Sequence, residues 1–279
     1  MTCLPPLPHT LRELDMSGTF MEPPPGPLPP HLTSLSMSNG SDLALGELPF
    51  TLEKLHMSAA YNEPLGPLPA SLVEITTSDR SEDGAEFDQS FGELPRGLQV
   101  LDLLEFHAFN HDLGALPAHL VMLTLGCQFN QHLGVLPDTL EVLVFYDGDD
   151  DSIFDQPLGP LPQSLRKLHL SSAFNQALGL LPPRLEYLEC VEYNHSLAPL
   201  PLTLQHLLIW NAAYNHDLGA LPPSLVELRI HPAEPGEQGA YTHRLQPIHP
   251  ALKAVAISRD YAYLDDLAGV ELAHNGMWR

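Results

Sequence analysis

Residues 174–190 read FNQALGLLPPRLEYLEC, and this stretch decides the fold. It opens on an aromatic residue followed by Asn175, continues through Leu-Gly, and passes through Leu181-Pro182 into Leu-x-x-Leu-x-Leu or a close variant. The Leu-Pro step recurs along the whole chain. Its leading residue lies at 7, 28, 48, 68, 94, 116, 136, 161, 181, 200 and 221, with a decayed copy at Ile248. About twelve repeats of about 20 residues indicate a repeat architecture.

A second element stands seven residues before the Leu-Pro step and consists of an aromatic residue followed by Asn or Asp. Its copies are Tyr61-Asn62, Phe87-Asp88, Phe109-Asn110, Phe129-Asn130, Phe154-Asp155, Phe174-Asn175, Tyr193-Asn194 and Tyr214-Asn215. The Asn or Asp side chain is expected at a turn, where it can bond backbone groups that lack a strand partner.

Each repeat is predicted to contain one short strand and an irregular return. The alternation in Leu165–Leu170 places Leu168 and Leu170 on one face of an extended chain, and Lys167 and His169 on the other. The residues expected to return inward are Phe174, Leu178 and Leu181. A unit this short cannot bury its own apolar face, so neighbouring units must stack. We therefore predict a mainly β, leucine-rich-repeat-like horseshoe with one parallel sheet on its inner face, irregular or 3₁₀ returns and little α-helix.

The charge balance narrows the choice of partners. The 279 residues include 35 acidic and 12 basic side chains, which gives a net charge of −23 at pH 7. Nucleic acid and an anionic membrane face would both be repelled, so neither is an expected partner. No apolar run approaches the ~18 residues of a membrane span, and the N-terminus does not have the pattern of a secretory signal. Three widely spaced cysteines, Cys3, Cys127 and Cys190, argue against a disulfide framework and favour the cytoplasm.

The combined string F-N-x-x-L-G-x-L-P-x-x-L-x-x-L-x-L resembles the FNIP repeat, a leucine-rich-repeat subclass found in amoebae and large DNA viruses. The resemblance covers roughly residues 5–257, and the fourth position of the motif is Pro at Pro64 and Pro157. It implies no catalytic residues. Many members of the family carry an F-box ahead of the repeats, which would imply the substrate-recognition part of a ubiquitin-ligase adaptor. This sequence begins directly in its first repeat.

We predict a single solenoid over residues 1–257 and a C-terminal cap over residues 258–279. The composition changes at that boundary. The apolar residues expected to form a short helical cap over the open end of the core are Tyr263, Leu267, Val270 and Leu272.

All variation in repeat length falls on the loop that leaves the strand. The two long loops, 78–86 and 146–153, are strongly acidic. Insertions confined to one rim are typical of a binding edge. Asp147, Asp149 and Asp151 alternate as calcium ligands do, but the glycine and the bidentate Glu of a calcium loop are missing. A solvated acidic loop is the main interpretation, and an ion site is the alternative.

The rim histidines are His111, His132, His195 and His216. They recur because the position recurs, and neighbouring turns do not supply a tetrahedral metal set. Catalytic motifs are absent from the sequence, including the serine elbow, the P-loop and the metalloprotease helix. No enzyme activity, cofactor or metal is expected.

The strand face that looks away from the core is polar in the early repeats and becomes apolar and aromatic later. The candidate protein-binding residues are Val142, Val144, Tyr146, Tyr187, Val191, His206, Leu208 and Trp210. Repeats 5 and 6 add Val100, Leu104 and Met122. Exposed apolar patches with Tyr and Trp are typical of protein-binding surfaces. The alternative is that the C-terminal segment or a second copy of the chain covers this face.

These patterns predict a non-enzymatic cytoplasmic scaffold that binds another protein through the inner sheet face, with the acidic rim steering a basic partner. The alternatives are a structural component that self-associates within a larger particle, the ubiquitin-ligase role, and a binder regulated by ions at the acidic loops.

Overall fold

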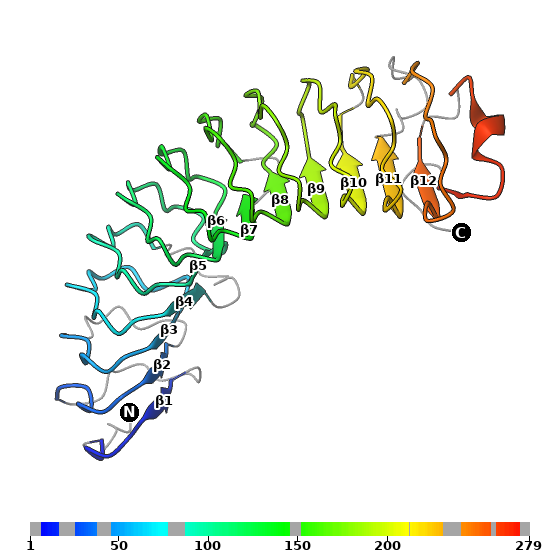
Figure 1. Cartoon of the computed structure of the whole chain (residues 1–279). Helices are drawn as coiled ribbons and strands as arrows, with labels where there is room; N and C mark the ends of the chain where they lie inside the picture. The colour runs from blue at the N-terminus through cyan, green and yellow to red at the C-terminus, as the bar shows by residue number, and fades with distance from the viewer. Residues whose placement is uncertain are drawn as a thin grey trace. The chain divides into compact units, whose positions relative to one another are not determined.

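The computed structural model describes residues 7–16, 26–37, 46–77, 87–145, 152–211, 213–230, 241–257 and 261–273. The chain divides into two compact units, residues 1–140 (unit 1) and 141–279 (unit 2), and each is described by itself. Figure 1 shows the labelled strands of each unit following one another in chain order. The domain prediction, a single solenoid followed by a cap, stays a prediction.

Unit 1 contributes one short strand per turn. The strands are β1 (Glu13–Asp15), β2 (Ser34–Ser36), β3 (Lys54–Met57), β4 (Glu74–Thr77), β5 (Val100–Leu103) and β6 (Met122–Leu125). Neighbouring strands pair in parallel, and equivalent residues of successive repeats lie side by side, as in Leu35, Leu55 and Ile75. These three side chains are fully buried.

Unit 2 repeats the arrangement. Its strands are β7 (Val142–Phe145), β8 (Lys167–Leu170), β9 (Tyr187–Cys190), β10 (His206–Ile209), β11 (Glu227–Ile230), β12 (Ala254–Ala256) and β13 (Glu271–Ala273). Leu168, Leu188 and Leu207 align across three strands and are fully buried, because strands with a period of two send alternate residues to the core. The predicted fold class is confirmed: both units are parallel, leucine-rich-repeat-like solenoids, and the one helix in the described residues is a 3₁₀ turn.

The aromatic residues of the second motif form a column inside the returns. In unit 2 the rings of Phe154, Phe174 and Tyr193 stack at centroid distances of 6.0 and 6.3 Å, within 11° of parallel. Phe109 and Phe129 do the same in unit 1, at 6.2 Å and 8°. All five are buried, so the motif aromatic fills the core on the side away from the sheet.

Two glycines stand where a side chain would not be tolerated, one in a return and one directly after a strand. Gly179, in the Leu-Gly step, has φ of +69°, a left-handed conformation that side chains with a Cβ adopt rarely. Gly126 instead lacks room: a Cβ there would lie 2.4 Å from the carbonyl oxygen of Phe106. Backbones of neighbouring turns therefore approach closely at Gly126.

The C-terminal segment adds a strand as well as a helical turn. The 3₁₀ helix covers Leu264–Leu267, and β13 then pairs in parallel with β12. Tyr261 is buried and continues the aromatic column from Tyr241, with ring centroids 6.3 Å apart. The sequence predicted a short helical cap; the described part of the segment combines one 3₁₀ turn with one further strand, and Leu272 on β13 is 36% exposed.

A bidentate ion pair fixes this last turn. The Arg244 guanidinium donates from Nε and Nη2 to the two carboxylate oxygens of Asp266, at 2.6 and 2.8 Å. These hydrogen bonds hold the pKa of Asp266 below its ordinary value.

Among the described residues, no helix has the length and apolar character needed to cross a membrane.

Candidate functional site: the inner face of unit 2

Seven of the eight predicted binding residues lie on one face of unit 2; Tyr146 and most of the two acidic loops lie outside the described residues. Val142 and Val144 stand on β7, and Tyr187 stands on β9. His206 and Leu208 stand on β10. Val191 and Trp210 follow the last residues of β9 and β10.

This face is more covered than the sequence suggested. Leu208 is only 8% exposed, and the other six side chains are half-buried. Strands spaced ~4.8 Å apart bring side chains of equivalent position into contact, so each one shields its neighbours. Leu208, for example, stands between Glu189 on β9 and Arg229 on β11.

Glu189 organises the centre of the face. Its Oε1 accepts a hydrogen bond from Trp210 Nε1 at 2.7 Å, and its Oε2 accepts one from the Tyr187 hydroxyl. His169 Nδ1 lies 3.8 Å from the same Oε2. The carboxylate is buried to a side-chain exposure of 14%, which strengthens these contacts relative to water. One carboxylate therefore holds two aromatic side chains of the face, Trp210 and Tyr187.

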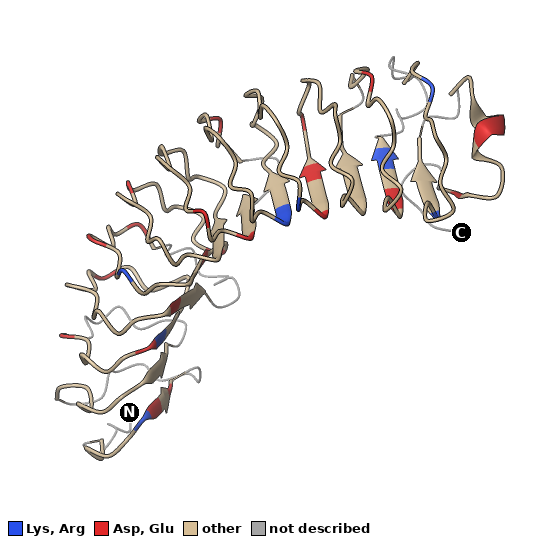
Figure 2. Cartoon of the chain, in the orientation of Figure 1, with Lys and Arg blue, Asp and Glu red and all other residues tan. Residues whose placement is uncertain are grey.

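Cations from the flanking strands lie over the rings. Lys167 Nζ on β8 lies 5.0 Å from the centroid of the Tyr187 ring, and Arg229 on β11 lies 5.7 Å from that of Trp210. Both distances are within the range of a cation–π interaction. Figure 2 shows the resulting mixture of charges: β8 carries blue, β9 red, and β11 both.

A second carboxylate, Glu227 on β11, is held by two donors. Arg229 Nε donates to Oε1 at 2.6 Å, and His206 Nδ1 lies 3.1 Å from Oε2. Burial alone would raise the pKa of Glu227, but the hydrogen bonds from Arg229 and His206 outweigh it, so the pKa lies below its ordinary value. The carboxylate is thus kept charged on the face.

Sequence reasoning missed the polar members of this network. These members are Lys167, Glu189, Glu227 and Arg229. They were missed because the search of the face considered only apolar and aromatic residues. The signal was available: these residues occupy the same two outward strand positions as Tyr187 and Leu208, so the repeat register alone places them side by side.

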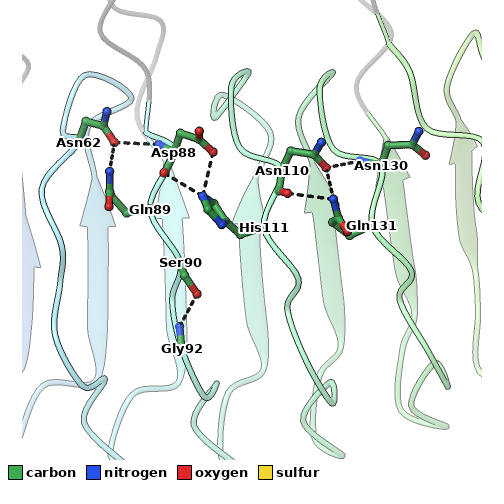
Figure 3. A network of polar contacts seen from close by, with 9 residues as sticks. All are labelled: Asn62, Asp88, Gln89, Ser90, Gly92, Asn110, His111, Asn130 and Gln131. Carbon is green, nitrogen blue, oxygen red and sulfur yellow. Dashed lines mark hydrogen bonds and ion pairs between the residues drawn. The ribbon is translucent and has the colours of Figure 1, made fainter.

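The rim beside the aromatic column is ordered by side-chain amides. Asn62 Oδ1 accepts the backbone N–H of Asp88 in the next turn at 2.9 Å, and Asn110 Oδ1 accepts that of Asn130 at 2.9 Å (Figure 3). In unit 2, Asp155 Oδ1 accepts from the backbone of Asn175 at 3.0 Å. The Asn or Asp that recurs in the repeats therefore joins one turn to the following one.

The rim histidines join turns in a related way. His111 Nε2 lies 2.9 Å from the carbonyl oxygen of Asp88, and His195 and His216 make the same contact with Asn175 and Asn194 at 2.8 and 2.9 Å. Because a carbonyl oxygen only accepts, each Nε2 carries the hydrogen. These three histidines directly follow the motif Asn. In the turn of Asn130 that position is taken by Gln131, which donates to the carbonyl oxygen of Asn110, and His132 comes one residue later.

His243 extends the histidine series beyond the predicted members, with Nε2 2.9 Å from the carbonyl oxygen of Asn215. The described residues contain no group of three or more His, Cys, Asp or Glu side chains arranged to hold a metal ion. Cys127 and Cys190 are both buried as thiols, and burial raises the pKa of Cys190 far above its ordinary value.

No family model matches the sequence, and no curated protein matches it. Among solved structures, the chain is similar to CroV588, described as a novel circular LRR protein structure, with 20% identity and a TM-score of 0.46. That match covers 96% of this chain and 53% of CroV588, so the chain spans about half the length of CroV588. It is also similar to YopM from Yersinia enterocolitica WA-314, with 22% identity and a TM-score of 0.47 over 96% of this chain and 72% of YopM.

Proposed function

We propose that the protein is a non-enzymatic repeat scaffold that binds another protein through the inner face of unit 2. The observation that carries the proposal is the sharing of Glu189 by Trp210 and Tyr187. Aromatic side chains whose positions are already held lose little conformational entropy on binding, and such residues dominate the energetics of many interfaces. Val142, Val144, Val191, His206 and Leu208 would supply the surrounding contact area.

The charge distribution supports a basic partner. The chain carries a net charge of −23, which attracts a positive protein over a distance. At the face itself, however, Lys167 and Arg229 accompany Glu189 and Glu227. Long-range attraction would therefore set the rate of encounter, while the aromatic centre would set the lifetime of the complex.

We include in this proposal the family class, the cellular location and the alternative roles predicted from the sequence. Assignment to the FNIP class is supported because each motif residue has a role of its own: the aromatic stacks, the Asn links turns and the Gly takes positive φ. A cytoplasmic location is supported by the two buried thiols. The ubiquitin-ligase and particle-assembly roles remain alternatives that the identity of the partner would separate.

The test is a pull-down from host lysate with wild type, Trp210→Asp and Tyr187→Asp. Ser36→Asp, on the polar inner face of β2 in unit 1, is the matched control. Circular dichroism confirms that each variant is folded. We expect one protein to be retained by wild type and by the control, and lost with both unit 2 variants. Equal retention by all four proteins would place binding elsewhere and contradict the proposal.

A further inference from the structure

In the part of the chain that the structure describes, the most exposed large apolar side chains are not on the inner face. Four of them, Phe50, Val135, Leu180 and Leu202, have exposed fractions of 75%, 91%, 80% and 74%. All stand at one of two positions in the repeat: between Gly and Leu-Pro, or directly after Leu-Pro. They belong to the edge where each return leads into the next strand.

In unit 2 these two positions form a continuous surface, which we call the acid-free ridge. Its members are exposed in three successive turns: Leu180, Pro183, Pro199, Leu202, Ala220 and Pro223. The turns are in direct contact along it, since Thr203 Oγ1 donates to the carbonyl oxygen of Pro183 at 2.7 Å. A Cβ built on Gly219 would lie 3.7 Å from that of Ala198, which places Pro199 beside Ala220.

The ridge contains no acidic residue. The stretches 178–185, 197–204 and 218–225 hold no Asp or Glu, and Arg184 is their one charged side chain, in a chain with 35 acidic residues. In unit 1 the equivalent turns alternate: Glu47, Glu93 and Asp138 place an acidic residue in three of them, whereas 65–72 and 113–120 hold none. An approaching molecule would meet a carboxylate at every second turn from 45–52 to 133–140 in unit 1, but none along the three successive turns of the ridge.

Part of the ridge backbone already has hydrogen-bond partners within the chain. The Ser224 hydroxyl hydrogen is shared between the carbonyl oxygens of Leu202 and Leu204, 2.6 and 2.7 Å from Oγ. The Thr203 hydroxyl is shared in the same way between those of Pro183 and Leu185. Two of the six ridge carbonyl groups thus already have partners, and three of the six residues are prolines without an N–H. The paired carbonyl groups and the three prolines can be covered without losing a hydrogen bond, and the other four carbonyl groups can keep water at the edge of the contact.

We propose that the acid-free ridge is the surface through which two copies of this chain associate. Two copies of a strongly acidic protein repel each other least where neither brings carboxylates, and the ridge meets that condition in both copies at once. The ridge has the same turn-to-turn spacing in both copies, so a two-fold arrangement lets the Leu and Pro side chains of one copy fit between those of the other. This inference is independent of the inner-face function.

Sedimentation velocity from low micromolar to millimolar concentration tests the proposal. Wild type should form a dimer whose population rises with added salt, because salt screens the repulsion between acidic copies elsewhere. The double variant Leu180→Glu, Leu202→Glu should weaken dimerisation by about tenfold or more. A wild type that stays monomeric at every concentration would overturn the proposal.

The matched control is the double variant Val135→Glu, Phe50→Glu. It changes side chains of similar exposure at the same two repeat positions, but in turns that already contain Asp138 and Glu47. The control should dimerise like wild type, and so should Trp210→Asp, which separates this surface from the inner face. A ridge variant that dimerises as strongly as wild type, or an equal loss in the control, would contradict the assignment.

Discussion

At the scale of single residues, the turn between repeats requires an acceptor oxygen at one point and does not depend on its charge. Asn175 Oδ1 accepts the backbone N–H of Asn194 at 3.0 Å, while Asp155 plays the same part toward Asn175 itself. Asn and Asp share that oxygen and differ in the other terminal atom. Their interchange among the eight motif copies is therefore a consequence of the hydrogen bond.

This bond gives a direct prediction for Asn175. Asn175→Ala removes the acceptor and should lower the free energy of unfolding by about 0.5–1.5 kcal/mol, the usual net value of one hydrogen bond. Asn175→Asp retains Oδ1 and should stay within about 0.5 kcal/mol of wild type. Urea denaturation followed by circular dichroism measures both; equal losses in the two variants would show that the acceptor is not what matters.

Gly126 gives a second prediction at this scale. A Cβ at this position would meet the carbonyl oxygen of Phe106 at 2.4 Å, so Gly126→Ala forces neighbouring backbones apart. We expect a loss of about 1–3 kcal/mol, as for other overpacked sites. Gly97→Ala is the control, because its nearest neighbour, the Ala70 carbonyl oxygen, lies at an ordinary 4.0 Å. Thermal unfolding should separate the two variants clearly.

At the scale of elements, the strands carry the stability of each turn. Leu168 on β8 is fully buried between equivalent leucines of the neighbouring strands, whereas Leu180 in the following return is 80% exposed. Leu168→Ala should cost roughly 2–5 kcal/mol of unfolding free energy, and Leu180→Ala should cost almost nothing. The same substitution at two sites of one repeat isolates burial as the cause. A comparable loss at both sites, measured by urea denaturation, would contradict this assignment.

The strands could be predicted from sequence because their periodicity follows from burial. The Leu-Pro step and the two alternating leucines located all the strands from β1 to β12, since a short strand with one apolar face leaves few alternatives. The column formed by Tyr241 and Tyr261 was missed, because Thr242 and Ala262 stand where the motif has Asn or Asp.

The candidate site was less accessible to sequence reasoning. Tyr187 and Trp210 could be identified because they are aromatic residues at outward strand positions. The burial of Leu208 could not, because it depends on the length of the side chains beside it on β9 and β11. Likewise, the exposure of Leu180 and Leu202 follows from the direction in which the return projects each side chain. A leucine at these positions looks like core in the sequence and lies at the surface.

At the scale of the whole molecule, the tyrosines of the aromatic column predict how stability depends on alkaline pH. Burial raises the pKa of Tyr241 to about 12, and burial also raises those of Tyr193, Tyr214 and Tyr261. An unfolded chain loses these protons near pH 10. Between about pH 10 and 12 the folded state therefore binds more protons than the unfolded state, and stability must fall as the pH rises.

We accordingly expect the contribution of these tyrosines to the free energy of unfolding to be constant below about pH 10 and to decrease above it. Tyr241→Phe removes one of the titrating hydroxyls and should make the decrease shallower. Urea denaturation at a series of alkaline pH values measures the slope. An unchanged slope in Tyr241→Phe would mean that its hydroxyl does not remain protonated in the folded state.

Equivalent residues of neighbouring strands pair directly, with no shift along the strand, and this determines how such a chain can change its length. Lys167 aligns with Tyr187, so excising 167–186 would join Arg166 to Tyr187 without moving any surviving residue along its strand. Leu143 would then meet Leu188, a partner chemically identical to the one it lost. A gene of this kind can gain or shed whole periods by recombination, whereas a deletion of a few codons within a strand or its return would break the alignment of the neighbouring turns.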